Sequence, residues 1–181
     1  VDIAERKQAE KILAENEEKY RQLFEMESDA IFLIENSTGK ISEVNQAAST
    51  LYGYTRDELR TMKNTDLSAE VSQTTEATLN RLERVPVRLH RKKDGSVFPV
   101  EISARHFILH GKEMHIAAIR DITERIAAKE QLEKQWLFLK NVIDNAPNSI
   151  YVLDSRYCVV LANKHFAELF GISPEEIIGK N

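Results

Sequence analysis

The spacing of apolar residues predicts a β-hairpin about thirty residues into the chain. Residues 30–35 (AIFLIE) form a short apolar run, and residues 41–44 (ISEV) form a second one. The STGK segment at 37–40 lies between them and has the composition of a turn. Two short apolar runs joined by a turn are typical of a pair of antiparallel strands.

Helical spacing then replaces this pattern. Residues 46–52 place apolar side chains on one helical face, and Gly53 suits the position after a helix end. Thr55 and Glu58 have the spacing of a capping box, which predicts a second short helix. Residues 69–84 predict a longer helix of weak amphipathicity. The residues expected to hold it are Val71, Ala77, Leu79 and Leu82.

A period of two follows, which predicts strands. The Asp94-Gly95 pair predicts a turn between two of these strands. In the first strand Val85, Val87 and Leu89 alternate with Pro86, Arg88 and His90. In the second, Phe98, Val100, Ile102 and Ala104 alternate with Pro99, Glu101, Ser103 and Arg105.

The pair His110-Gly111 fits a two-residue hairpin turn before a further strand. This register makes one face of the hairpin apolar and gives the other an opposite-charge pair, so we expect the apolar face to be core and pocket wall. The opposed pairs are Ile102 with Ile119, Ala104 with Ala117, and Glu101 with Arg120.

The chain also repeats itself. A shift of 119 residues places Leu13 on Leu132 and Ile31 on Ile150, and after one deleted residue the match continues with Asn45 on Asn163. We interpret the chain as a slice of a tandem array, and a first residue other than Met fits that interpretation. The expected parts are a helical linker at 1–19, a complete domain at 20–125, a second linker at 126–140 and half a domain at 141–181.

Three segments resemble the PAS domain family in their residues, their order and the spacing between them. They are VNQAASTLYGYTRDEL, HRKKDGSVFPVEIS and IRDITER. The resemblance covers residues 20–125 in full and 139–181 as a first half. It implies an α+β fold with a five-stranded antiparallel sheet, helices on one face and flanking coiled-coil-like helical linkers. It also implies a sensory and dimerisation module of a bacterial or archaeal signalling protein. Asn45 and Asn163 match the asparagine that usually opens the first helix, as a cap or as a ligand contact.

The resemblance leaves the ligand unidentified. Flavin-photosensing members carry a reactive cysteine after that asparagine, and NQAAST has none, so a flavin photoadduct is not expected. Haem-binding members commonly carry a histidine on the longer helix, and residues 69–84 contain none, so haem is not expected either. A small-molecule pocket and a simple core are alternative interpretations of the residues that line the cup. These residues are Phe32, Tyr52, Tyr54, Val87, Leu89, Phe98, Val100, Ile102 and Ile119.

His106 and His115 face each other in the predicted hairpin register. Two histidines could begin a metal site, but a third ligand is not obvious. We therefore expect solvated histidines at the strand ends and predict no metal site.

Both linkers carry a two-heptad seam with a polar residue at the same position. Recurrence beside a sheet favours helices of a parallel homodimer, in which Asn16 and Gln135 would set the register; a helix packed on its own domain is the alternative. The first seam is Ala9, Leu13, Asn16, Tyr20 and Leu23, and the second is Ala128, Leu132, Gln135, Leu139 and Val142.

An Asp-x-x-Glu box precedes each seam, at Asp2 to Glu5 and at Asp121 to Glu124, and is expected to cap the helix start. RDITER is therefore the expected join between the last strand and the outgoing helix. In PAS proteins this join passes a change in the sheet to the effector. Ala4 stands where the second copy has Thr123, so one hydroxyl contact is absent from the first copy.

Composition narrows the setting. With 42% hydrophobic residues among 181, the chain is long enough to fold. Its longest apolar stretches are far shorter than the roughly 18–20 residues of a membrane span. A single cysteine, Cys158, excludes an intrachain disulfide and favours a reducing, cytoplasmic setting. The net charge of −4 gives no broad basic surface for nucleic acid. The short basic run Arg91 to Lys93 precedes Asp94-Gly95, and we interpret it as a charged turn and not as a phosphate-binding patch.

No catalytic constellation is recognisable, so we do not expect this chain to be an enzyme. Three function classes stay open. The first is a sensor and dimerisation module of a larger signalling protein, for which we favour a sensor histidine kinase, with a diguanylate cyclase or a transcription regulator as alternatives. The second is a ligand-independent structural spacer. The third is a small metal-dependent enzyme that would use His106 and His115.

Overall fold

The computed structural model describes residues 3–171 and 173–180 and divides after Glu124 into two compact units. The first unit contains the elements α1 (Ile3–Met26), β1 (Ala30–Glu35), β2 (Ile41–Val44), α2 (Gln46–Tyr52), α3 (Arg56–Thr61), η1 (Asn64–Leu67), α4 (Val71–Leu79), β3 (Arg84–Arg91), β4 (Val97–Leu109) and β5 (Lys112–Asp121). Helix α5 (Thr123–Asp144) leads to β6 (Tyr151–Leu153), β7 (Val159–Ala162), α6 (Lys164–Phe170) and α7 (Pro174–Ile177).

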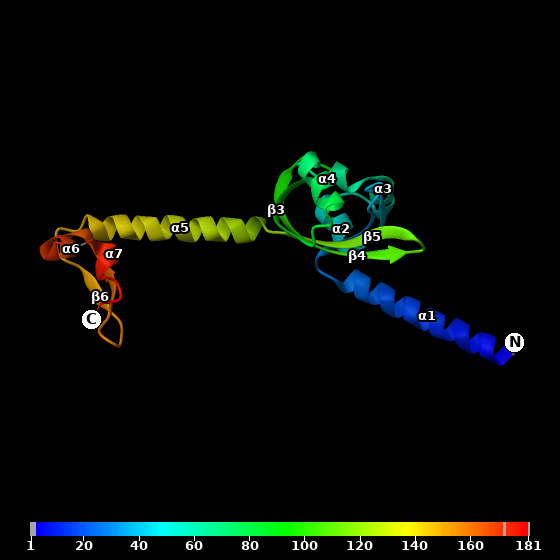
Figure 1. Ribbon diagram of the computed structural model, residues 1–181, viewed down its shortest axis with the longest axis horizontal. Helices are drawn as coiled ribbons and strands as arrows, with labels where there is room; N and C mark the ends of the chain where they lie inside the picture. Colours follow the sequence, from blue (N-terminus) through cyan, green and yellow to red (C-terminus); the bar gives the residue numbers. More distant parts are fainter. Residues whose placement is uncertain (1–2, 172, 181) are drawn as a thin grey trace. The chain divides into compact units, whose positions relative to one another are not determined.

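The first unit is built on a five-stranded antiparallel sheet in the order β2-β1-β5-β4-β3. Figure 1 shows α2, α3 and α4 gathered over one face of this sheet. The expected α+β architecture, with helices over one face of an antiparallel sheet, is therefore confirmed.

The predicted β4–β5 hairpin is confirmed residue by residue. Leu109 and Lys112 are paired across a two-residue turn, and the same register brings Glu101 opposite Arg120. His110 and Gly111 have φ angles of 48° and 77°, as a tight hairpin with the twist of a sheet requires. The turn thus fixes which residues of both strands face the helices.

The short helices begin and end as their capping residues predict. The Asn45 side chain accepts a hydrogen bond from the backbone of Ala48, and Gly53 ends α2 with a φ of 77°. Thr55 and Glu58 form the reciprocal capping box of α3. These local signals hold α2 and α3 against the sheet edge, where Tyr52 and Leu59 are fully buried.

The longer helix predicted at residues 69–84 is shorter in the structure. It spans only Val71–Leu79, because Asn80 ends it and Arg81 takes a left-handed φ of 50°. The expected apolar anchors Val71, Leu79 and Leu82 are exposed. Instead Thr74 is buried and shares a 2.7 Å hydrogen bond with the Ser68 hydroxyl, so a polar contact holds the helix to the preceding turn.

The predicted alternation along β3 is also wrong, and a β-bulge is the reason. Val85 pairs with Ile102 and Arg88 pairs with Val100, so two residues of β3 oppose Glu101 alone. One of the two is Pro86, which has no N–H to donate and is therefore favoured at a bulge.

The bulge reverses the face of every residue that follows it. Arg88 and His90 are buried on the helix side, whereas Val87 and Leu89 are exposed. The expectation that Val87 and Leu89 line the cup is therefore overturned.

The core of the first unit lies between the sheet and the short helices. Phe32, Tyr52 and Phe98 are at its centre, and the Tyr52 ring lies edge-on to both phenylalanines at centroid distances of 5.5 and 5.6 Å. The other members are apolar side chains from β1, β2, β4, β5 and α2 to η1, namely Ala30, Ile34, Ile41, Val44, Ala48, Leu59, Leu67, Val100, Ala117 and Ile119.

The second unit repeats the beginning of the first. Strands β6 and β7 form an antiparallel hairpin, and Asn163 caps α6 as Asn45 caps α2. Within the part of the chain that is described, β6 pairs with β7 alone, whereas its counterpart β1 has a strand on each side. Tyr151 is accordingly exposed, although the equivalent Phe32 is buried.

Candidate functional site

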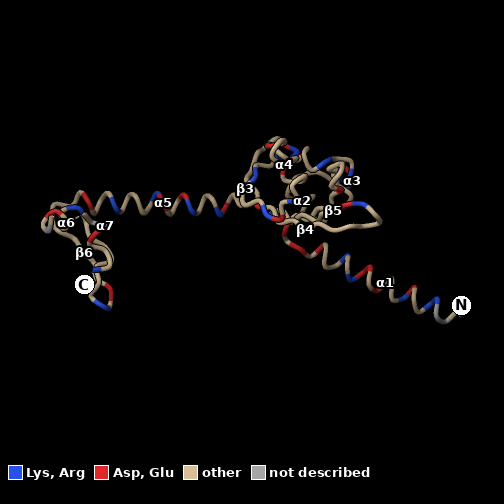
Figure 2. Tube along the Cα trace, in the orientation of Figure 1, with Lys and Arg blue, Asp and Glu red and all other residues tan. Residues whose placement is uncertain are grey.

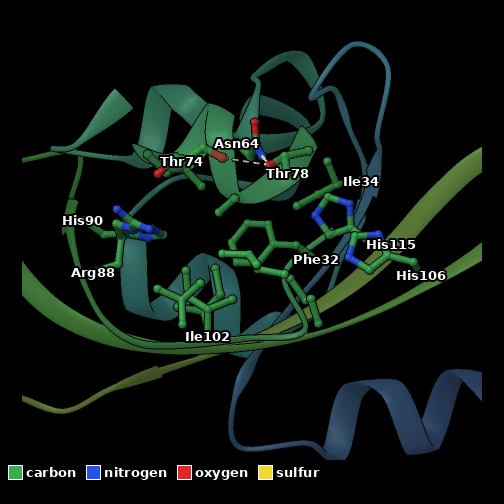
Figure 3. A pocket seen from close by; sticks show the side chains of 17 residues that line it. Phe32, Ile34, Asn64, Thr74, Thr78, Arg88, His90, Ile102, His106 and His115 are labelled. Atoms are coloured by element: carbon green, nitrogen blue, oxygen red, sulfur yellow. Dashed lines mark hydrogen bonds between the residues drawn. The ribbon is translucent and has the colours of Figure 1, made fainter. Parts of the chain in front are cut away.

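A small cavity of about 60 Å³ lies between α4 and the inner face of the sheet (Figure 3). Apolar side chains form its sheet side, and polar side chains lie at two ends and along the helix side, where Asn64, Thr74 and Thr78 are. The apolar wall is Phe32, Ile34, Leu67, Val85, Ile102, Ala104, Ala117 and Ile119, with Ala77 and Leu82 on the helix side. The polar lining is Asn64, Thr74, Thr78, Arg88, His90, His106 and His115.

The predicted pocket residues divide into three groups. Phe32, Ile102 and Ile119 line the cavity. The second group fills the core outside the cavity lining, and consists of Tyr52, Phe98 and Val100 with the partly buried Tyr54. The third is the exposed pair Val87 and Leu89.

Arg88 and His90 make the first polar end of the cavity. Arg88 is only 8% exposed, and its guanidinium donates to the amide oxygen of Gln73. His90 is 3% exposed, and its Nδ1 lies 2.6 Å from the Tyr52 hydroxyl. Burial, and to a lesser degree the nearby Arg88 charge, lower the pKa of His90 to about 4, so its ring is neutral at pH 7.

The other polar end is organised by Asn36. Its amide oxygen lies 2.5 Å from His115 Nδ1, and its amide nitrogen lies 3.2 Å from His106 Nδ1. His115 is buried, which contradicts the expectation of two solvated histidines, and burial, with His106 as a smaller cause, lowers the pKa of His115 to about 4. His106 Nε2 is buried without a hydrogen-bond partner.

Sequence reasoning missed the polar character of this cavity. Pro86 was the available signal for Arg88 and His90, because a proline inside a strand predicts a bulge that changes which residues face inward. No local signal pairs Asn36 with His115, since 79 residues separate them. In the described part of the chain, no group of three or more His, Cys, Asp or Glu side chains is placed to hold a metal ion.

The size of the cavity limits its ligands. Pockets for drug-sized molecules have volumes of roughly 300–1,000 Å³. A cavity of about 60 Å³ instead suits a molecule with a few non-hydrogen atoms, or several waters.

Asn45 lies outside the cavity and acts as a junction. Its side-chain oxygen accepts hydrogen bonds from the backbone of Ile31 and Ala48, and its nitrogen donates to the carbonyls of Phe24 and Asp29, among others. One buried side chain therefore joins α1, β1 and α2. It is a structural cap without a place in the cavity lining.

Asn163 makes equivalent contacts in the second unit, except for the Asn45 hydrogen bond to the Glu27 carbonyl. It accepts from the backbone of Ile150 and Phe166, and donates to the carbonyls of Ile143 and Asn148. Ile143 belongs to α5, as Phe24 belongs to α1. Each module is thus fastened to the helix that precedes it by an equivalent asparagine.

The strand β5 passes into α5 through a compact join. Arg120 donates two hydrogen bonds, of 2.9 and 2.7 Å, to the Asp29 carboxylate. Asp121 accepts from both the backbone N–H and the hydroxyl of Thr123, at 2.9 and 2.6 Å. The partner of Asp121 is therefore Thr123, where we had expected Glu124, and the first-copy box at Asp2 lies outside the described residues. Ile122, the residue between Asp121 and Thr123 in the sequence, is buried.

The seam residues of both linkers are exposed. Leu13 is 68% exposed and Leu132 is 67% exposed, and no residue of α5 is buried. Basic and acidic side chains are interspersed along both helices (Figure 2). Near its end α5 meets its own module, where Leu139 and Ile143 line a groove beside β7. None of the described helices has the length and apolar character that a membrane crossing would need.

Comparison with known protein families gives two matches in tandem. The model of a family described as "PAS domain" matches residues 28–124, which is more than half of the chain. A second model, described as "PAS fold", matches residues 137–181. The two matched segments correspond to the complete and the partial copy in the sequence.

Similar proteins are sensors and kinases. Sporulation kinase E of Bacillus subtilis is 25% identical over 180 residues, which cover 97% of this chain and 24% of the kinase. The methyl sulfide methyltransferase-associated sensor of Methanosarcina acetivorans is 28% identical over 127 residues, covering 67% of this chain and 13% of that protein. The chain therefore spans about a quarter or less of these relatives.

Solved structures agree with the fold. The crystal structure of the PAS domain of an HTR-like protein from Haloarcula marismortui superposes with a TM-score of 0.58 at 28% identity. The superposition covers 64% of this chain and 99% of that domain.

Proposed function

This chain belongs to the PAS domain family, and from that premise we propose that it relays the state of its cavity through α5 to a downstream effector domain. The observation that carries the proposal is the position of the cavity wall next to the join. Ile119 lines the cavity, and α5 begins four residues later at Thr123. A ligand that favours one packing of this wall can therefore bias the start of the helix.

The effector is proposed from the relatives. Sporulation kinase E is a kinase by name and matches 97% of this chain, so we favour a histidine kinase as the downstream effector domain. A diguanylate cyclase or a transcription regulator is the alternative. We assign no catalytic activity to this chain and place it in the cytoplasm. Its proposed parts are a linker at 1–19, a full domain at 20–125, a linker at 126–140 and a partial domain at 141–181.

A parallel homodimer is the proposed form in which the relay works. The exposed seams around Leu13 and Leu132 support it, because large apolar side chains repeated at heptad spacing are stabilised when a second helix covers them. Asn16 and Gln135 occupy equivalent exposed positions on these seams and would set the register.

The dimer is tested by Leu132→Asp in the whole chain, with Leu137→Asp as the matched control. Leu137 is exposed on the same helix but stands outside the seam. We expect sedimentation equilibrium to give a dimer for the wild type and for Leu137→Asp, and a monomer for Leu132→Asp. Trp136 emission should change with the loss of the dimer, since Trp136 neighbours the seam.

Two results would reject this proposal. An unchanged mass and an unchanged Trp136 emission in Leu132→Asp would show that α5 is not a dimer element. A wild-type chain that stays monomeric, with no small molecule altering its shape in a metabolite screen, would favour the ligand-independent spacer.

A further inference from the structure

The cavity contains a buried cation without an anionic partner. The Arg88 guanidinium is turned inward by the bulge, and its hydrogen-bond partner is the neutral amide of Gln73. Among the described residues, no carboxylate forms an ion pair with Arg88. Because removing a guanidinium from water is costly unless an anion compensates, this site favours a negatively charged ligand.

His90 provides a second donor at the same end. We assign the Tyr52 hydroxyl as the donor to His90 Nδ1, because burial keeps the phenol protonated and His90 is the one acceptor found for its proton among the described residues. The proton of the neutral His90 ring is then on Nε2. That nitrogen is buried without any hydrogen-bond partner, and His90 lines the cavity. An acceptor in the cavity would satisfy it.

The wall next to these two donors carries apolar side chains. Phe32 and Ile102 face the space beside the two donors (Figure 3), and Val85 also lines the cavity. One water needs roughly 10–15 Å³ of comparable space, so the cavity of about 60 Å³ has room for about four such positions. Acetate, with four non-hydrogen atoms, has this size.

We propose that the cavity binds a short-chain monocarboxylate of the size of acetate or propionate. The carboxylate accepts hydrogen bonds from Arg88 and from His90 Nε2, and the alkyl group packs against Phe32 and Ile102. A planar guanidinium matches a carboxylate in shape and charge. The apolar wall favours a carboxylate with an alkyl group over an inorganic anion of equal charge. The inference rests on the proposed function in one respect, namely that this cavity is the ligand site whose state is relayed.

The test is thermal unfolding of the whole chain at pH 7.5 in sodium acetate, sodium propionate, sodium nitrate or sodium chloride at one ionic strength. We expect a saturable rise in Tm with acetate and propionate relative to chloride. Arg88→Met should abolish the rise, whereas Arg91→Met should retain it, because Arg91 is an exposed arginine of the same strand. Arg88→Lys should raise the half-saturating acetate concentration by about tenfold, because lysine keeps the charge but lacks the planar guanidinium that binds a carboxylate through two N–H groups.

Three outcomes would overturn the inference. They are no saturable rise in the wild type, the same half-saturating acetate concentration in Arg88→Met, and an equal effect of nitrate. If Arg88→Met does not fold, an unchanged half-saturating acetate concentration in Arg88→Lys overturns the inference instead. Sedimentation of the same samples separates this inference from the relay: acetate binding to a monomer would reject the dimer and leave the ligand site standing.

Discussion

Asn45 and Asn163 show how one residue can serve two modules in the same way. Each is fully buried, and each joins the incoming helix, the first strand and the next helix through both ends of its amide. A buried amide with all these partners is difficult to replace, because each lost contact leaves a backbone group unpaired.

Replacing Asn45 by alanine should therefore lower the free energy of unfolding by about 3 kcal/mol, since several buried backbone groups lose their partner. Urea unfolding monitored by far-UV circular dichroism measures this loss. Asn141→Ala, at an exposed position on α5, is the control and should change the stability little. An Asn45→Ala protein as stable as that control would contradict the assigned role.

Two buried histidines make the stability dependent on pH. The pKa values of His90 and His115 are lowered to about 4 by burial, while the unfolded chain titrates near 6.5. Between these values the unfolded chain binds more protons, so the folded state loses stability as pH falls from about 6.5 towards 4. Arg88 faces His90, and His106 faces His115, and both add to the direction of the shift.

We expect the free energy of unfolding to fall by about 2 kcal/mol from pH 7 to pH 5.5, with both histidines contributing. Urea unfolding at the two pH values gives this difference. His115→Gln should show about half of it, because the glutamine does not titrate. Equal stability at the two pH values in the wild type would mean that the folded and unfolded chains bind the same number of protons, so the two pKa values are not lowered.

At the scale of elements, local chemistry predicted more than long-range pairing did. The box of Thr55 and Glu58 and the turn at His110-Gly111 depend on neighbours in sequence, and both are found as expected. The face of Arg88 depends on how β3 pairs with β4, and only Pro86 marks that irregularity in the sequence. Three of the residues expected in the pocket, Phe32, Ile102 and Ile119, line the cavity, while its charged end was missed.

The open edge of β6 gives a prediction for the second unit. Strand β1 has neighbours on both sides, but in the described residues β6 has only β7, so half of its backbone groups face no strand. Hydrogen exchange should therefore be much faster in Tyr151–Leu153 than in Ala30–Glu35. Edge strands β7 and β2, each with one neighbour, give the baseline difference between the two units. Protection of β6 equal to that of β1 in a monomer would contradict the open edge.

At the scale of the whole molecule, the chain consists of repeated units in which a helix with exposed apolar residues precedes a PAS module. The same asparagine fastens each helix to the module that follows. In the proposed relay, a change at the cavity wall of the first module reaches the second module through α5. This account depends on α5 meeting its counterpart in a second copy of the chain.

Disulfide cross-linking at Leu132 tests that claim most directly. The measurement uses Leu132→Cys in a chain whose native cysteine is removed by Cys158→Ser, with Leu137→Cys as the control outside the seam. In a parallel, in-register pair of helices, identical seam positions face each other. We predict rapid formation of a covalent dimer under mild oxidation for Leu132→Cys and slow formation for Leu137→Cys. Equal rates for the two variants, or no covalent dimer for Leu132→Cys, would contradict the account.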